Sequence, residues 1–77
     1  MAHANKVARS VETPDGLRCV DVFRAAGGGW GFAEYRRDPE DPRGWAPTGQ
    51  EASGFGSARA ELDAACRRVP WLADVLG

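Results

Sequence analysis

Histidine and cysteine are scarce in this chain, which has one His and two Cys among 77 residues. The single imidazole, His3, lies in a polar, Ala-rich segment that we expect to be frayed, whereas a general base must be held within hydrogen-bond reach of its target. A zinc site needs about four Cys or His ligands, and neither Cys19 nor Cys66 has another close by in the sequence. We therefore predict no catalytic residue, no metal and no cofactor.

Long apolar runs are also missing. The longest apolar-rich stretch, residues 69–76, is interrupted by Asp74, and the first residues hold no apolar core of the kind that a signal peptide needs. We therefore expect a cytoplasmic protein that does not enter a membrane. In that compartment the two cysteines would stay reduced, where such residues usually pack as small apolar groups.

Neither sign of charge is in excess, because 10 Lys and Arg face 11 Asp and Glu and the net charge is −1. The chain thus lacks the overall basic field that favours a polyanionic partner. At this length a single hydrophobic core rarely supplies more than about 3–5 kcal/mol. We expect one domain over residues 1–77, with residues 1–5 as a disordered tail.

Turn signals divide the first two thirds of the chain into strands. Pro14-Asp15-Gly16 joins two runs into a hairpin, and the glycine-rich residues 25–29 form the next connection. Pro47 allows an edge strand at best where it stands, and the hydrophobic pattern changes its period after residues 50–56. The expected strands cover residues 7–13, 17–24, 30–37 and, as the edge strand, 45–48.

The register of the second and third strands can be predicted from parity, since successive side chains point to opposite faces. An odd number of residues in their connection gathers the large apolar side chains on one face, whereas an even number scatters them over both, so we expect the odd one. The core face then carries Val20, Val22, Trp30 and Phe32. The opposite face carries Cys19, Asp21, Phe23, Ala33, Tyr35 and Arg37.

The last third of the chain has helical periodicity. Apolar residues recur at intervals of three and four, as on one side of an amphipathic helix, at Ala58, Leu62, Ala65, Cys66 and Val69. Ser57 is the natural N-cap, and Pro70 ends this helix and suits the first turn of a second, short one. The prediction is an α+β fold: a three- to four-stranded antiparallel sheet covered on one face by a C-terminal helix, with a short extra helical segment at the C-terminus.

Three tryptophans are unusual in so short a chain. One interpretation places all three in or near the core, where aromatic side chains supply apolar area. In the other, aromatic residues and an arginine on the uncovered sheet face form a platform for bases or a peptide. Residues 69–76 either fold back on the sheet or present their apolar side to a second copy or another protein. The candidate binding residues are Phe23, Tyr35, Arg37, Trp45 and Trp71.

Residues 30–39, with Trp45 and the Ala-rich helix that follows, resemble the second strand, turn, third strand and helix of plant ethylene-response-factor DNA-binding domains. The arm-binding domain of phage integrases shares that layout. The resemblance implies recognition of DNA by the sheet, with Arg24, Arg36, Arg37 and Trp45 at positions that contact DNA. The chain as a whole resembles short uncharacterised bacterial α+β proteins, a likeness that implies no activity.

Missing catalytic groups together with abundant large aromatic residues favour a non-enzymatic protein-interaction module. Its partner would be another protein or a second copy of the chain, bound by the exposed sheet face or by the C-terminal segment. The alternative is nucleic-acid binding through the exposed face of the β-sheet. An enzyme is the third possibility, and it would depend on carboxylates, Tyr35 or a thiol in a domain with little room for a deep pocket.

Overall fold

The computed structural model describes residues 5–25 and 27–77, so most of the expected tail, His3 included, lies outside the described residues. Asn5, which we expected in the tail, begins the first strand. The elements in chain order are β1 (Asn5–Glu12), β2 (Arg18–Ala25), β3 (Trp30–Arg37), β4 (Trp45–Phe55), α1 (Ala58–Arg68) and α2 (Pro70–Leu76). This arrangement confirms the predicted α+β class and antiparallel sheet, with two helices after four strands.

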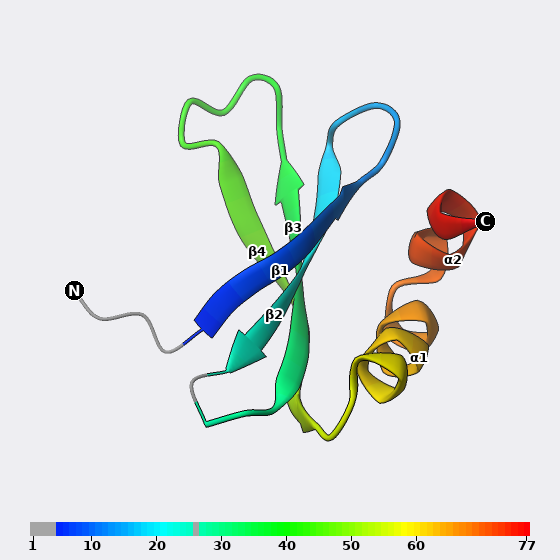
Figure 1. Cartoon of the computed structure of the whole chain (residues 1–77). Coiled ribbons are helices and arrows are strands. Elements are labelled where there is room, and N and C mark those ends of the chain that lie inside the picture. The colour runs from blue at the N-terminus through cyan, green and yellow to red at the C-terminus, as the bar shows by residue number, and fades with distance from the viewer. Residues whose placement is uncertain (1–4, 26) are drawn as a thin grey trace.

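The four strands form one antiparallel sheet in which each strand pairs with its neighbours in sequence, in the order β1-β2-β3-β4. In Figure 1 both helices lie to the same side of the twisted sheet. One face of the sheet is therefore covered by helices, and we call the opposite one, over which no helix of residues 5–25 and 27–77 lies, the helix-free face. Among the described residues, no helix has the length and apolar character needed to cross a membrane.

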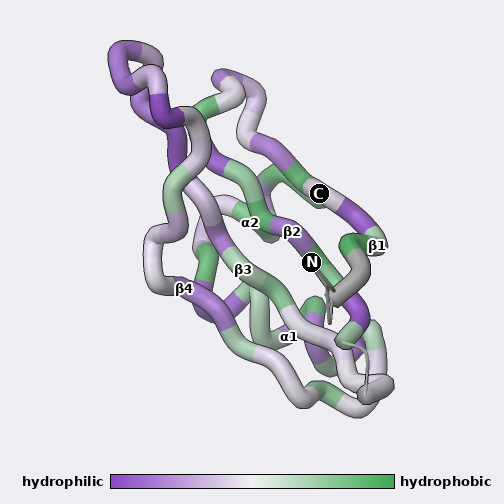
Figure 2. Tube along the Cα trace, turned by 90° about the vertical axis from the view of Figure 1, so that its left-hand side faces the viewer, coloured by the Kyte–Doolittle hydropathy of each residue, from purple (hydrophilic) through white to green (hydrophobic). Residues whose placement is uncertain are grey.

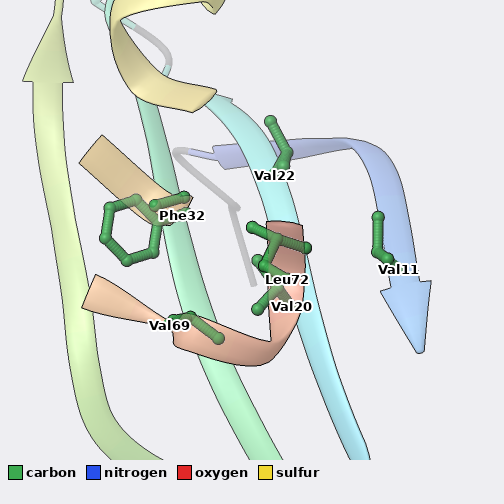
Figure 3. Close-up of a cluster of buried hydrophobic side chains, with 7 residues drawn as sticks. Val11, Val20, Val22, Phe32, Val69 and Leu72 are labelled. Carbon is green, nitrogen blue, oxygen red and sulfur yellow. The ribbon is translucent and has the colours of Figure 1, made fainter. Parts of the chain in front are cut away.

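The register of β2 and β3 is the one that parity predicts. Arg24 pairs with Trp30 and Val22 with Phe32, which leaves an odd number of residues in the connection. The buried apolar cluster on the helix-covered face consists of Val11, Val20, Val22, Phe32, Ala65, Val69 and Leu72. Figure 3 shows six of these side chains converging from three strands and the C-terminal segment. The alternation of apolar and polar side chains along the strands thus makes one face of the sheet apolar, and the helices cover that face.

The turn between β1 and β2 follows its Pro-Asp-Gly signal. The carboxylate of Asp15 accepts a hydrogen bond from the Thr13 hydroxyl at 2.6 Å and another from the Leu17 amide at 3.0 Å. These two bonds lower the pKa of Asp15. Gly16 adopts a φ of 72°, which an L side chain rarely does. The turn is therefore closed by its own side chains.

Strand β4 is much longer than the edge strand expected over residues 45–48, because it continues to Phe55. Its pairing with β3 shifts twice, between Trp30 and Phe32 and between Ala33 and Tyr35. Such bulges break the simple alternation of buried and exposed residues, which conceals a strand from sequence patterning. Ala52 and Phe55 nevertheless pack against the core, and Pro47 is tolerated because β4 is an edge strand.

The side of helix α1 that is buried differs from the apolar side predicted from the sequence. Ala65 is buried as expected, but the other buried residue of the helix is Glu61, while Leu62 is half-buried and Ala58 is exposed. The C-terminal end of α1 runs directly into the core at Val69, which is 1% exposed. The helix therefore buries the carboxylate of Glu61 while part of its predicted apolar stripe stays partly exposed.

Ser57 caps α1 as predicted, because its hydroxyl accepts a hydrogen bond from the backbone amide of Ala60 at 3.1 Å. Replacing Ser57 by Ala removes this acceptor and leaves a helix N–H to water. We expect Ser57→Ala to lower the free energy of unfolding by about 1 kcal/mol in urea titrations followed by circular dichroism. Ser57→Asp, which keeps an acceptor, should stay close to the wild type; equal losses in both variants would contradict the capping role.

Helix α2 folds back on the domain. Leu72 is 1% exposed within the core cluster, and Trp71 packs against the same cluster. The indole N–H of Trp71 donates a 2.7 Å hydrogen bond to the carboxylate of Glu34 in β3. The other oxygen of that carboxylate accepts from the Thr48 hydroxyl at 2.8 Å, and Arg18 lies 3.7 Å from the oxygen that Trp71 contacts. A buried acid is thus satisfied while it ties the C-terminal helix to the sheet.

Candidate functional site

The helix-free face brings together four of the five predicted binding residues. Directly opposite residues of antiparallel strands point to the same side of a sheet, so the pairs Cys19–Tyr35 and Asp21–Ala33 share this face with Phe23 and Arg37. The neighbouring strands add Ser10 and Glu12 from β1, and Trp45, Pro47 and Glu51 from β4. Trp71 lies with α2 on the opposite side, where it contributes to the core rather than to this surface.

An open depression of about 260 Å³ lies on the helix-free face between β1 and β4. Two aromatic rings and two carboxylates contribute to its lining. The lining residues are Ser10, Glu12, Cys19, Asp21, Tyr35 and Trp45. All four strands contribute to this depression, so its shape depends on the register of the whole sheet.

The polar part of the depression is an ordered cluster around Asp21. One oxygen of this carboxylate accepts a 2.7 Å hydrogen bond from the Ser10 hydroxyl and a 3.4 Å hydrogen bond from the Cys19 thiol. Cys19 is 8% exposed although no helix covers it. Burial, followed by the hydrogen bond to Asp21 and the charges of Asp21 and Glu12, raises its pKa to about 12. The thiol therefore stays protonated at neutral pH and adds no charge.

Arg37 and Trp45 form a stacked pair at one end of the face. The guanidinium carbon of Arg37 lies 4.7 Å from the centroid of the indole ring, within the range of a cation–π interaction. The same guanidinium donates a 2.8 Å hydrogen bond to the carbonyl of Gly16 in the β1–β2 turn. Arg37 thus connects the β1–β2 turn to the first residue of β4, because it contacts both Gly16 and the ring of Trp45. The Trp45 side chain remains 38% exposed.

Phe23 lies on the same face as the other three residues but outside the depression. It lines a separate hollow with residues of β4 and is half-buried. Its ring crosses Gly31 of β3 so closely that a side chain there would touch it. The structure therefore divides the predicted platform into a part built from Tyr35, Arg37 and Trp45 and a separate apolar contact at Phe23.

The arginines that the DNA-binding resemblance implies do not share one face. Arg24 packs over the ring of Trp30 at 5.2 Å, and both belong to the helix-covered side of the register. Arg36 has the same parity as Phe32 and therefore also points away from the helix-free face. Of the implied contacts, Arg37 and Trp45 remain on the helix-free face.

The turn between β3 and β4 is rich in charged residues, and Figure 2 shows it as a hydrophilic stretch. Asp41 forms a 2.8 Å ion pair with Arg43 and also accepts a hydrogen bond from the Arg43 backbone amide. These contacts lower the pKa of Asp41. Asp38 accepts a hydrogen bond from the Glu40 amide. The acids of this turn therefore order the loop itself.

Sequence reasoning missed Ser10 and Glu12 as parts of the site. The pairing of β1 with β2 shifts between Val7 and Arg9, so simple alternation from the start of β1 does not identify the face on which a later residue lies. Counting back from the Pro-Asp-Gly turn would have found them, because Glu12 pairs with Cys19 on the strand that follows that turn.

Comparisons of this chain with protein-family models, with curated proteins and with solved structures found no match.

Proposed function

We propose that this chain is a non-enzymatic protein-interaction module that binds its partner through the helix-free face. The observation that carries the proposal is the open depression between Tyr35 and Trp45, which is lined by aromatic and acidic side chains on a face that no helix covers. Exposed aromatic residues beside a hollow are typical anchors of protein interfaces, because they supply much contact area at low entropic cost.

The charge of this face favours a protein over a nucleic acid. Three carboxylates, those of Glu12, Asp21 and Glu51, lie on it with the single guanidinium of Arg37. Nucleic-acid binding depends on neutralising phosphates with basic side chains, and carboxylates on the same surface oppose it. The placement of Arg24 and Arg36 on the opposite side further weakens that alternative.

The chemistry of the depression favours binding over catalysis. Its thiol, Cys19, has a pKa of about 12 and donates a hydrogen bond to Asp21, so the thiolate that a nucleophilic step requires is scarce at neutral pH. The hydroxyl of Ser10 donates to the same carboxylate, and no described His lines the hollow to act as its base. A volume of about 260 Å³ also lies below the roughly 300–1,000 Å³ typical of sites for cofactors and drug-sized molecules. Such a hollow suits a single side chain of a partner.

The C-terminal segment is the less favourable surface. Its largest apolar side chains already pack within the domain, since Leu72 is buried and the indole N–H of Trp71 donates a hydrogen bond to Glu34. Val75 is the exposed large apolar residue of α2, at 38%. A single exposed Val is ordinary on a protein surface and needs no partner.

Trp45→Ala tests the proposed surface against a matched control. Chemical crosslinking in cells that express the protein, with mass spectrometry, identifies partners, and light scattering reports self-association. We expect Trp45→Ala to reduce partner recovery by about tenfold or more. Val75→Ala removes an equally exposed side chain on the other side of the molecule and should leave recovery unchanged.

Three outcomes would overturn the proposal. The first is a strictly monomeric protein that recovers no partner. The second is equal partner recovery with Trp45→Ala and with Val75→Ala. The third is preferential recovery of nucleic acid with an affinity that falls steeply as salt is raised, which would establish the alternative.

A further inference from the structure

We infer that the depression on the helix-free face receives a cationic side chain, a lysine or an arginine, from a segment of the partner protein. This inference rests on the proposed function and adds the chemistry of the group that is recognised. The observation behind it is the combination, in one open hollow, of the rings of Tyr35 and Trp45 with the carboxylates of Glu12 and Asp21.

The aromatic lining provides the first part of the argument. A cation placed over the face of Trp or Tyr is attracted by the negative centre of the ring, and Trp gives the strongest such interaction. Trp45 already takes part in one, because the guanidinium of Arg37 lies 4.7 Å from its centroid. Arg37 does not line the depression, and its Nη2 donates to the carbonyl of Gly16.

The carboxylates provide the second part, because no basic residue among the described ones forms an ion pair with them. The hydrogen bonds to the Asp21 side chain come from neutral donors, the Ser10 hydroxyl and the Cys19 thiol. Within the part of the chain that the structure describes, no ion pair joins Asp21 or Glu12 to a basic residue. None of the described Lys and Arg side chains lines the hollow. The lining therefore carries two formal negative charges, and the guanidinium of Arg37, which stacks on Trp45 next to the hollow, offsets at most one of them. The remaining excess favours a cation over an acidic or phosphorylated segment.

The size and openness of the hollow agree with a side chain as its occupant. Its volume is about 260 Å³, and it is open to solvent. That space admits one long side chain together with some retained water. It is lined from β1 and β2 on one side and from β3 and β4 on the other, so a segment lying across the strands could place one basic residue between them.

The inference can be tested by NMR titration of the full chain with peptides that differ in one residue. The probes are Gly-Gly-Lys-Gly-Gly and Gly-Gly-Arg-Gly-Gly, and their controls carry norleucine or Glu in place of the basic residue. We expect the Lys and Arg peptides to shift the amide signals of Ser10, Cys19, Asp21 and Tyr35 and the indole signal of Trp45. The norleucine and Glu peptides should leave these signals in place.

Matched charge variants locate the binding. Glu12→Gln removes one negative charge from the lining and should raise the Kd for the Lys peptide by about two- to fivefold, as an exposed ion pair would predict. Glu51→Gln makes the same change in charge on the same face, but Glu51 lines the separate hollow at Phe23. The Kd of Glu51→Gln for the Lys peptide should stay within about 1.5-fold of the wild-type value, because solvent screens the more distant charge.

The outcomes separate this inference from the proposed function. Equal shifts with the Lys and norleucine peptides would overturn the cationic occupant and leave the surface itself intact. Equal effects of Glu12→Gln and Glu51→Gln, or no shift with any peptide at millimolar concentration, would also overturn the cationic occupant. The Trp45→Ala crosslinking experiment tests the proposed function independently, since it makes no assumption about charge.

Discussion

Glu61→Met is expected to stabilise the protein at neutral pH, although it replaces a charged residue on a helix. The Glu61 side chain is buried at 1% exposure, and its Oε2 atom has no hydrogen-bond partner. An unsatisfied buried polar group costs about 1–3 kcal/mol, and Met has a similar shape without that cost. We therefore expect the free energy of unfolding to rise by about 1–3 kcal/mol, and the melting temperature by roughly 5–20 °C.

The gain from Glu61→Met should depend on pH in a defined direction. Burial raises the pKa of Glu61 above its ordinary value of 4.5, so the folded chain holds this proton to a higher pH than the unfolded chain does. Over the interval between the two pKa values, the contribution of this group to stability falls as pH rises. The advantage of Met should thus be smallest below the unfolded pKa, grow through that interval, and level off above the folded pKa.

Urea unfolding of the wild type and Glu61→Met at about pH 4 and pH 7 measures this difference. Asp15 and Asp41 have lowered pKa values and give stability that is lost at acid pH, but they do so equally in both proteins and cancel in the comparison. Asp63→Asn removes an equal charge from an exposed position of the same helix and should show little change. A destabilised Glu61→Met, or an equal gain at both pH values, would contradict the argument.

Glu61 also shows where the fold could not be predicted from the sequence. Strand parity correctly identified the core residues of β2 and β3, because alternation is a local property. Which side of α1 faces the core depends instead on its packing against β3 and β4, which lie outside the helix in sequence. Helical periodicity therefore predicted that α1 exists and where it is capped, but it favoured Leu62 as a core residue where the structure buries Glu61.

The candidate site was predictable to a similar extent. The shared face of Phe23, Tyr35 and Arg37 follows from the register of two adjacent strands, and Trp45 joins them because it pairs with Arg37. The bulge in β1 hid the contribution of Ser10. The role of Trp71 depended on a distant partner, the buried carboxylate of Glu34, which sequence spacing does not reveal.

Gly31→Ala is expected to cause the largest loss of stability among single methyl additions at the described glycines. A Cβ atom on Gly31 would lie 2.6 Å from Cζ of Phe23 and 2.8 Å from the backbone oxygen of Ala52. The ring can rotate away, but the oxygen belongs to the backbone of β4 and cannot move without disturbing the sheet. Overpacking of this kind costs about 1–3 kcal/mol, a large share of the about 3–5 kcal/mol available to a domain of this size.

Two comparisons make the Gly31 prediction specific. Gly56→Ala adds the same methyl group where no atom lies within 4 Å, and urea unfolding should find it close to the wild type. In a Phe23→Ala background the ring is gone, so Gly31→Ala should cost less than in the wild type while the clash with Ala52 keeps the cost above zero. Strict additivity of Phe23→Ala and Gly31→Ala would mean that the ring does not cross Gly31. A smaller cost of Gly31→Ala in the Phe23→Ala background would show that the ring of Phe23 occupies the space that a side chain at residue 31 would need. The position of the ring over Gly31 also keeps Phe23 apart from the hollow between Tyr35 and Trp45.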